Sequence, residues 1–114
     1  MKRIKKFDMV LRKEKTLVEA GINPIVFQAY ADSCRRGYSI LNFDEAIWEK
    51  DIEPIIGICR QEGFEKITIS STQCGIGDLL LKFQQHGCKI DGMTKVDRSY
   101  YIKEERAAFI IKIY

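Results

Sequence analysis

The sequence lacks the features that identify several large classes of protein. Its 114 residues include only two prolines and one histidine, and they contain no internal repeat, low-complexity tract or linker. The longest apolar runs span only a few residues, such as 55–58, which excludes a membrane-crossing helix. No apolar stretch follows the basic start of the chain, so we expect no signal peptide. These absences favour one domain over 1–114 in the cytoplasm.

The cysteines form no recognisable motif. They lie far apart and include no Cys-x-x-Cys pair, at Cys34, Cys59, Cys74 and Cys88. In a chain without a secretory signal, we expect such cysteines to be mostly small apolar core residues. His86 and Cys88 are the only close histidine and cysteine, and one pair does not make a zinc site. The sequence therefore predicts no metal and no cofactor.

Helical spacing of apolar residues marks the first half of the chain. It predicts a first helix over 5–20, closed by Gly21, with the charges on the opposite side. Asn23 followed by Pro24 is a typical helix start, because asparagine caps the helix and proline fits its first turn. The second helix therefore begins here and ends at Gly37.

The middle of the chain is the hardest part to interpret. Residues 40–43 form either a short strand or an extended connector. Asp44 is a candidate cap for a short helix that carries Trp48. A further helix is expected to start at Asp51, with Pro54 tolerated in its first turn.

The second half changes to the alternation that is typical of strands. Residues 66–70 alternate and are rich in β-branched side chains, which predicts a strand. A turn and a helix that ends near His86 follow. A second strand is expected over 88–96, bulged at Gly92, and a last strand over 107–113.

The predicted order of elements is helices followed by β-α-β-β. Crossover connections between strands of one sheet are right-handed in nearly all proteins, so the first two strands should be parallel. The final hairpin then adds an antiparallel strand. We therefore predict an α+β domain of two layers, with a small mixed three-stranded sheet and the helices mainly on one face.

The turn after the strand over 66–70 is the best candidate for a ligand site. It leads into a helix, and the free N–H groups of a helix N-terminus favour anions. The hydroxyls and glycines that suit a phosphate or carboxylate are Ser70, Ser71, Thr72, Gly75 and Gly77. A P-loop is excluded because no Gly-Lys-Ser/Thr sequence follows. In the alternative interpretation, Ser71 or Thr72 only caps the helix.

The sequence contains no complete catalytic constellation. Cys74 lies in the same turn, where the helix terminus would stabilise a thiolate. A nucleophilic cysteine needs a base or a cation beside it, and the only histidine is His86. The intervening helix spans ~18 Å, so the two residues cannot meet. We assign no catalytic residue and do not expect an enzyme.

The charges are unevenly distributed along the chain. Residues 1–15 carry seven basic and two acidic side chains, whereas the other 99 residues carry 12 basic and 14 acidic ones. Basic ends can attract nucleic acid or an acidic protein surface, so Lys5 and Lys6 are candidate contact residues. An acidic stretch over 44–53 covers a solvated helix face or serves as a docking surface.

The segment before the last strand combines aromatic and basic side chains. Exposed tyrosines beside arginine or lysine can stack on bases or anchor protein interfaces. The candidate interaction residues here are Arg98, Tyr100, Tyr101 and Lys103. In the alternative interpretation, the two tyrosines simply begin the final hairpin.

Several short segments resemble a known group of proteins. They are Gly21-Ile22-Asn23-Pro24, Gln28-Ala29-Tyr30, Asn42-Phe43-Asp44-Glu45, Ile52-Glu53-Pro54-Ile55 and Thr68-Ile69-Ser70-Ser71-Thr72. Together they resemble an uncharacterised family of short bacterial and phage-type mobile-element proteins, and the similarity covers most of the chain. Because that family has no assigned activity, the resemblance implies no catalytic residues. It implies an accessory role, such as modulating a host or rival system.

Three functions stay open at the level of sequence. The first is a non-enzymatic protein-interaction or accessory module, such as a small mobile-element inhibitor or modulator of a host system. The second is a nucleic-acid-binding module that uses the basic N-terminal helix and the tyrosine-rich loop. The third is a small anion- or nucleotide-binding domain built on the turn over 70–78. The near-neutral body weighs against nucleic acid, so we expect a protein partner, no membrane and an oligomeric state that the sequence leaves open.

Overall fold

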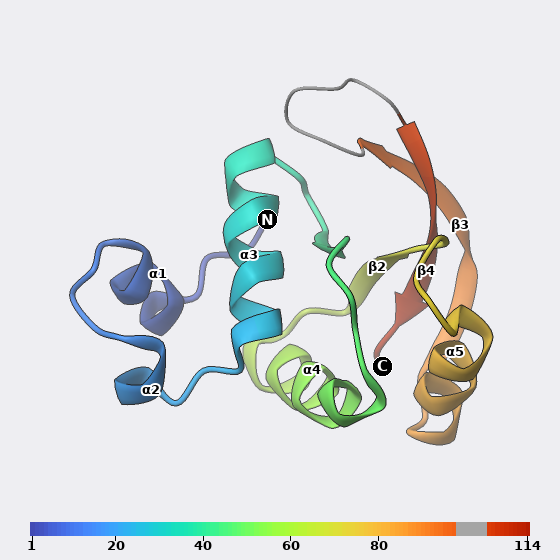
Figure 1. Cartoon of the computed structure of the whole chain (residues 1–114), viewed down its shortest axis with the longest axis horizontal. Coiled ribbons are helices and arrows are strands. Elements are labelled where there is room, and N and C mark those ends of the chain that lie inside the picture. The colour runs from blue at the N-terminus through green and yellow to red at the C-terminus, as the bar shows by residue number, and fades with distance from the viewer. Residues whose placement is uncertain (98–104) are drawn as a thin grey trace.

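The computed structural model describes residues 1–97 and 105–114 (Figure 1). In chain order, the elements are α1 (Lys5–Leu11), α2 (Leu17–Ala20), α3 (Pro24–Arg36), β1 (Leu41–Phe43), α4 (Glu49–Glu62), β2 (Lys66–Ser70), α5 (Ile76–Gln85), β3 (Lys89–Asp97) and β4 (Glu105–Lys112). Within these residues, the strands form a mixed four-stranded sheet in the order β1-β2-β4-β3. The protein is therefore α+β, as predicted, but its sheet has four strands and not three.

The additional strand is β1. It pairs in parallel with β2, so that Leu41 lies opposite Ile67 and Phe43 lies opposite Ile69. Helix α4 forms the crossover between the two strands. Leu41 and Phe43 are buried, so this short segment contributes two large side chains to the core. Of the two alternatives open for residues 40–43, the strand is correct.

Strand β4 lies between β2 and β3 and pairs antiparallel with both. As a result, β2 and β3 run in the same direction, as predicted, although they are not neighbours. The predicted bulge is confirmed, because the register between β3 and β4 shifts between Ile90 and Met93. Gly92 lies in this irregularity with a φ of 97°, a backbone conformation that favours glycine.

One hydrophobic core joins the helices to the sheet. Its members from α4, α5 and the strands include Ile52, Ile55, Ile56, Cys59, Leu79, Phe83, Leu41, Phe43, Ile67, Ile69 and Ile111. The core extends to α1 and α3. There the buried rings of Phe7 and Tyr30 pack in a T-shaped, edge-to-face arrangement with their centroids 5.1 Å apart. Figure 1 shows α3 standing between the sheet and the pair α1–α2. No helix in the described part of the chain is long and apolar enough to cross a membrane.

The helix predicted over 5–20 is wrong, because two helices occupy this range. Lys13 adopts a φ of 60°, a left-handed conformation that interrupts a helix. The second helix, α2, then starts afresh with Thr16 as its cap, whose hydroxyl accepts the Glu19 N–H at 3.2 Å. The predicted start of α3 is confirmed, since the Asn23 side chain accepts backbone N–H groups from the first turn.

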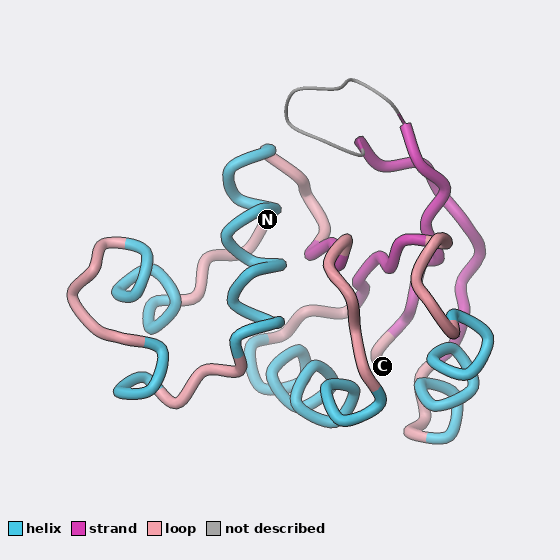
Figure 2. Tube along the Cα trace, in the orientation of Figure 1, coloured by secondary structure: helices cyan, strands magenta, loops and turns pink. Residues whose placement is uncertain are grey.

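The short helix predicted after Asp44 is also wrong. Figure 2 shows this part of the chain as a loop that leads from β1 to α4. The buried side chain of Gln73 provides the reason. Its Oε1 accepts the Ile47 N–H at 3.1 Å, and its Nε2 donates to the Glu45 carbonyl. These bonds hold the backbone of the loop in a conformation other than a helix.

Helix α4 begins two residues before the predicted start at Asp51. The Asp51 carboxylate accepts the Trp48 N–H at 2.9 Å, which stabilises the first turn. Pro54 consequently lies inside the helix and not in its first turn, contrary to the prediction. Because proline has no N–H, the Lys50 carbonyl lacks its usual helical donor.

Candidate functional site

The turn predicted to bind an anion lies where the parallel strands β1 and β2 end. Ser70 closes β2 and is buried, and its Oγ lies 3.0 Å from Thr72 Oγ1. Arg106 Nη1 approaches Ser70 Oγ at 3.3 Å and Asp44 Oδ1 at 3.4 Å. The structure therefore groups the predicted hydroxyls with an arginine that the sequence analysis missed. Arg106 is 36 positions from Ser70, so no local pattern could have pointed to it.

The other predicted residues of this turn have different structural roles. Ser71 donates its backbone N–H to the Ala107 carbonyl at 3.0 Å. Gly75 is the cap of α5, with a φ of 68°, and Gly77 is the second residue of that helix. The alternative in which Ser71 or Thr72 caps the helix is wrong, because no side chain caps α5. The charge of Arg106 is matched by Asp44, so the turn combines hydrogen-bonding groups with little net attraction for an anion.

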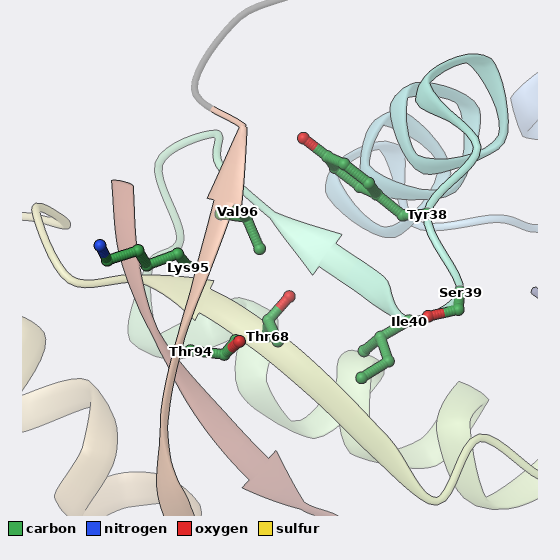
Figure 3. A pocket seen from close by; sticks show the side chains of 7 residues that line it. All are labelled: Tyr38, Ser39, Ile40, Thr68, Thr94, Lys95 and Val96. Atoms are coloured by element: carbon green, nitrogen blue, oxygen red, sulfur yellow. The ribbon is translucent and has the colours of Figure 1, made fainter. Parts of the chain in front are cut away.

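A hollow of about 240 Å³ lies over the sheet near the end of α3 (Figure 3). It is lined by Tyr38, Ser39, Ile40, Thr68, Thr94, Lys95 and Val96. Figure 3 shows Thr68 and Thr94 on the strands, with Tyr38 extending from the segment that follows α3. The Thr68 hydroxyl already donates to Asn42 Oδ1 at 2.7 Å. The polar side-chain groups of this lining are hydroxyls and the ammonium group of Lys95.

The cysteines differ in exposure. Cys59 and Cys88 are buried, as predicted, and Cys34 is half-buried. Burial raises the pKa of Cys59 to about 12 and also raises the pKa of Cys88. Cys34 packs against the core, so three of the four cysteines agree with the prediction that most are core residues, and Cys74 is exposed. Among residues 1–97 and 105–114, no group of three or more side chains is placed to hold a metal ion.

The basic N-terminal segment carries its positive charge on lysines. Both of its acidic residues pair with arginines, at Arg3–Asp8 (2.7 Å) and Arg12–Glu14 (3.0 Å). Lys5 is exposed, and the Lys6 ammonium lies 6.0 Å from the centre of the Phe7 ring. The other predicted interaction residues, Arg98, Tyr100, Tyr101 and Lys103, lie outside the described residues.

Trp48 is a surface feature that the sequence analysis missed. Its side chain is 61% exposed at the start of α4. Trp48 lines one hollow, and the next residue, Glu49, lines another. The larger, about 450 Å³, is lined by Asn23, Pro24, Ile25, Trp48, Lys50 and Asp51. The smaller, about 140 Å³, is lined by Glu49, Asp78, Leu81, Lys82 and Gln85. We call the residues of the two hollows, together with the exposed Glu45 and Glu53 of the same acidic stretch, the Trp48 surface.

The backbone that presents Trp48 is held from both sides. The preceding residue, Ile47, is buried, and its N–H donates to Gln73. The Trp48 N–H donates to Asp51, and the Asp51 N–H donates back to the Trp48 carbonyl at 2.9 Å. The indole is therefore displayed on an ordered part of the fold, which lowers the entropy that a partner would have to remove on binding.

A tryptophan within an acidic stretch was the signal available in the sequence. The interpretation of residues 44–53 as a short helix and a helix start gave Trp48 no special position. Only the loop conformation held by Gln73 turns this side chain outward, because Ile47 beside it takes the buried place.

Comparison with known proteins places the chain in one family. A family model described as "Domain of unknown function (DUF7698)" matches residues 25–112. The Trp48 surface lies almost wholly within this range, whereas α1 and α2 precede it. Neither the curated proteins nor the solved structures yield a match. A family without an assigned function agrees with the resemblance found in the sequence.

Proposed function

The chain belongs to the DUF7698 family, and we propose that it acts as a non-enzymatic protein-interaction module whose docking surface is the Trp48 surface. The observation that carries the proposal is the exposure of Trp48 on a backbone held by Gln73 and Asp51. Tryptophan is enriched among the residues that dominate interfaces, because its burial removes a large apolar area from water. An exposed indole on a held backbone is therefore suited to anchor a partner.

The shape of this surface supports the same proposal. The hollow that Trp48 lines and the hollow that Glu49 lines can each receive side chains of a partner. Leu81 on α5 is 52% exposed beside the smaller hollow and adds a second apolar contact. An apolar centre with a charged rim is the usual composition of a protein interface.

The resemblance to short mobile-element proteins supports a biological setting for this interaction. We place the module in the cytoplasm as an accessory factor that modulates a host or rival system. An accessory factor of this kind needs a docking surface and no catalytic centre.

A capture experiment with matched variants tests the proposal. The tagged chain, its Trp48→Ala variant and its Tyr114→Ala variant are each incubated with nuclease-treated host lysate, and bound proteins are quantified by mass spectrometry. Tyr114 is a suitable control because it is 55% exposed and lies outside the Trp48 surface. A partner held by the natural chain and by Tyr114→Ala should be lost from Trp48→Ala. Equal capture by all three proteins would overturn the proposal.

A second candidate function is nucleic-acid binding by the N-terminal segment. The ion pairs Arg3–Asp8 and Arg12–Glu14 favour it. Because both carboxylates of this segment pair with arginines, the positive charges of its lysines are not balanced within the segment. Binding of this kind falls steeply as salt rises. A double charge reversal, Lys5→Glu with Lys6→Glu, should abolish the shift of a duplex DNA probe, and an unchanged shift would exclude this function. The anion-binding interpretation of the turn over 70–78 stays a prediction.

A further inference from the structure

We infer that the Trp48 surface receives a basic segment of its partner, with lysine or arginine side chains around an apolar anchor. This inference rests on the proposed function, because it names the chemistry of the partner at the same surface. It depends on three features of the structure: the carboxylates around Trp48, the Lys50 carbonyl to which Pro54 cannot donate, and the apolar side chains that line the hollows.

The carboxylates around Trp48 carry a negative charge that the fold does not neutralise. Glu45, Glu49 and Glu53 are exposed on the stretch that contains Trp48, and Asp78 lines the smaller hollow. Among the described residues, none of these four carboxylates forms an ion pair. They outnumber the two lysines that line the hollows. The rim of the surface is therefore acidic and attracts cationic side chains.

Several carboxylates elsewhere in the molecule pair with basic side chains. Asp8 pairs with an arginine at 2.7 Å, and Asp32 pairs with Arg35 on the exposed side of α3. Asp91 lies 2.9 Å from the Lys66 ammonium, which lowers the pKa of that carboxyl. The concentration of carboxylates without such partners beside an exposed indole sets the Trp48 surface apart from the rest of the described surface.

Pro54 changes the hydrogen bonding in the first turns of α4. Pro54 cannot donate to the Lys50 carbonyl, and Lys50 itself lines the larger hollow. An ammonium or guanidinium group is a donor that can satisfy such a carbonyl. The partial positive charge at the start of α4 does not offset this preference, because Glu49 and Asp51 lie in the first turn.

The indole itself also favours a cationic partner. Lysine and arginine side chains are attracted to the face of an aromatic ring, and tryptophan is the best ring for this contact. Ile25, which lines the larger hollow with Trp48, and Leu81, which lines the smaller hollow, provide apolar area for the methylene stems of these side chains or for an apolar residue next to them. The chemistry of the surface thus matches a segment in which basic and apolar residues alternate.

Fluorescence provides a direct measurement, because Trp48 is the only tryptophan of the chain. The probe is a synthetic peptide of alternating lysine and leucine, and the control peptide carries glutamate in place of every lysine. The lysine peptide should shift the emission of Trp48 and protect it from acrylamide quenching, and the glutamate peptide should do neither. Equal effects of the two peptides, or no effect of either, would overturn the inference.

A charge variant tests which residues create the preference. The combined substitution Glu45→Gln, Glu49→Gln and Glu53→Gln should weaken binding of the lysine peptide roughly tenfold at low salt, since each exposed ion pair contributes a modest part. The control variant combines Glu62→Gln with Glu65→Gln, two residues outside the Trp48 surface, and should bind like the natural chain. Equal weakening in both variants would contradict a specific acidic rim.

Photo-crosslinking separates failure of the inference from failure of the proposed function. Leu81 is replaced by p-benzoylphenylalanine in the full chain, and the crosslinked peptide is identified after irradiation in host lysate. A crosslink to a basic segment of another protein supports the inference. A crosslink to a neutral or acidic segment, or to a second copy of this chain, overturns it while the proposed docking surface stands. If no crosslink forms and capture of partners does not depend on Trp48, both the inference and the proposed function are overturned.

Discussion

The hydroxyl of Tyr30 donates a hydrogen bond to the carboxylate of Asp8, with Oη and Oδ1 2.7 Å apart. The same hydroxyl accepts the backbone N–H of Ile4 at 3.0 Å. Arg3 Nη2 donates to the same Asp8 oxygen, Oδ1, at 2.7 Å. These bonds join α1, which precedes the range matched by the family model, to α3 inside that range. The N-terminal segment is therefore part of the folded core and not an appendage to it.

Removing the Tyr30 hydroxyl should destabilise the protein. Tyr30→Phe keeps the ring that packs on Phe7 but leaves the buried Ile4 N–H without its acceptor. We expect a loss of about 1–3 kcal/mol in the free energy of unfolding, measured by urea denaturation. The control Tyr114→Phe, at an exposed ring, should change the stability by less than about 0.5 kcal/mol. Equal stability of the two variants would contradict the role of this hydroxyl.

The same residue predicts a loss of stability in alkaline solution. Burial, together with the hydrogen bond to Asp8, raises the pKa of Tyr30 above its ordinary value of about 10. Because the pKa is higher in the folded state, the stabilisation is complete below about pH 10 and falls as the pH rises toward the folded pKa. Urea denaturation at several alkaline pH values should therefore show a steeper decline for the natural chain than for Tyr30→Phe. Parallel declines would be evidence against this coupling.

The buried amide of Gln73 should control the order of the loop before α4. Gln73→Ala leaves the Ile47 N–H and the Glu45 carbonyl without their partners. We expect a cost of about 1–3 kcal/mol in the free energy of unfolding and a lower fluorescence anisotropy of Trp48, because the loop gains freedom. Gln85→Ala, at an exposed position on α5, is the matched control. An unchanged anisotropy in Gln73→Ala would show that other contacts hold the loop.

The four cysteines should react with a thiol reagent in a defined order. Cys74 is exposed and should be modified fast in the native protein, whereas Cys59 and Cys88 should react only after unfolding. Burial excludes the reagent from Cys59, and its pKa of about 12 leaves almost no thiolate near neutral pH. Stopped-flow measurements with a chromogenic disulfide should show that Cys74→Ser removes the fast phase. A fast phase that survives in this variant would contradict the predicted order.

Local patterns predicted those parts of the fold in which neighbouring residues decide the backbone. The strand at 66–70 was predicted with the bounds it has, because alternation and β-branching act within a few positions. The start of α3 was equally local, since the Asn23 side chain bonds to the N–H groups next to it. The break of the predicted first helix at Lys13 was missed, because apolar spacing continues across it.

The candidate sites show the same division more strongly. Ser70 and Thr72 could be found from the sequence, but their neighbour Arg106 could not, because β4 brings it from a distant part of the chain. Exposure of Trp48 could not be predicted either, since apolar spacing assigned it to a helix. Gln73 bonds to the backbone of Ile47 and Glu45, 26 and 28 positions away, and holds this segment as a loop where a helix was predicted.

The sequence by itself determined the α+β class, the caps of α3, the strand β2 and the bulge in β3, because each follows from propensities and hydrogen bonds between near neighbours. Tertiary structure alone decided that β4 inserts between β2 and β3, that β1 completes the sheet and that Trp48 faces solvent. These features depend on contacts between distant segments, whose free energy appears only when the core is assembled, and no local pattern carries that information.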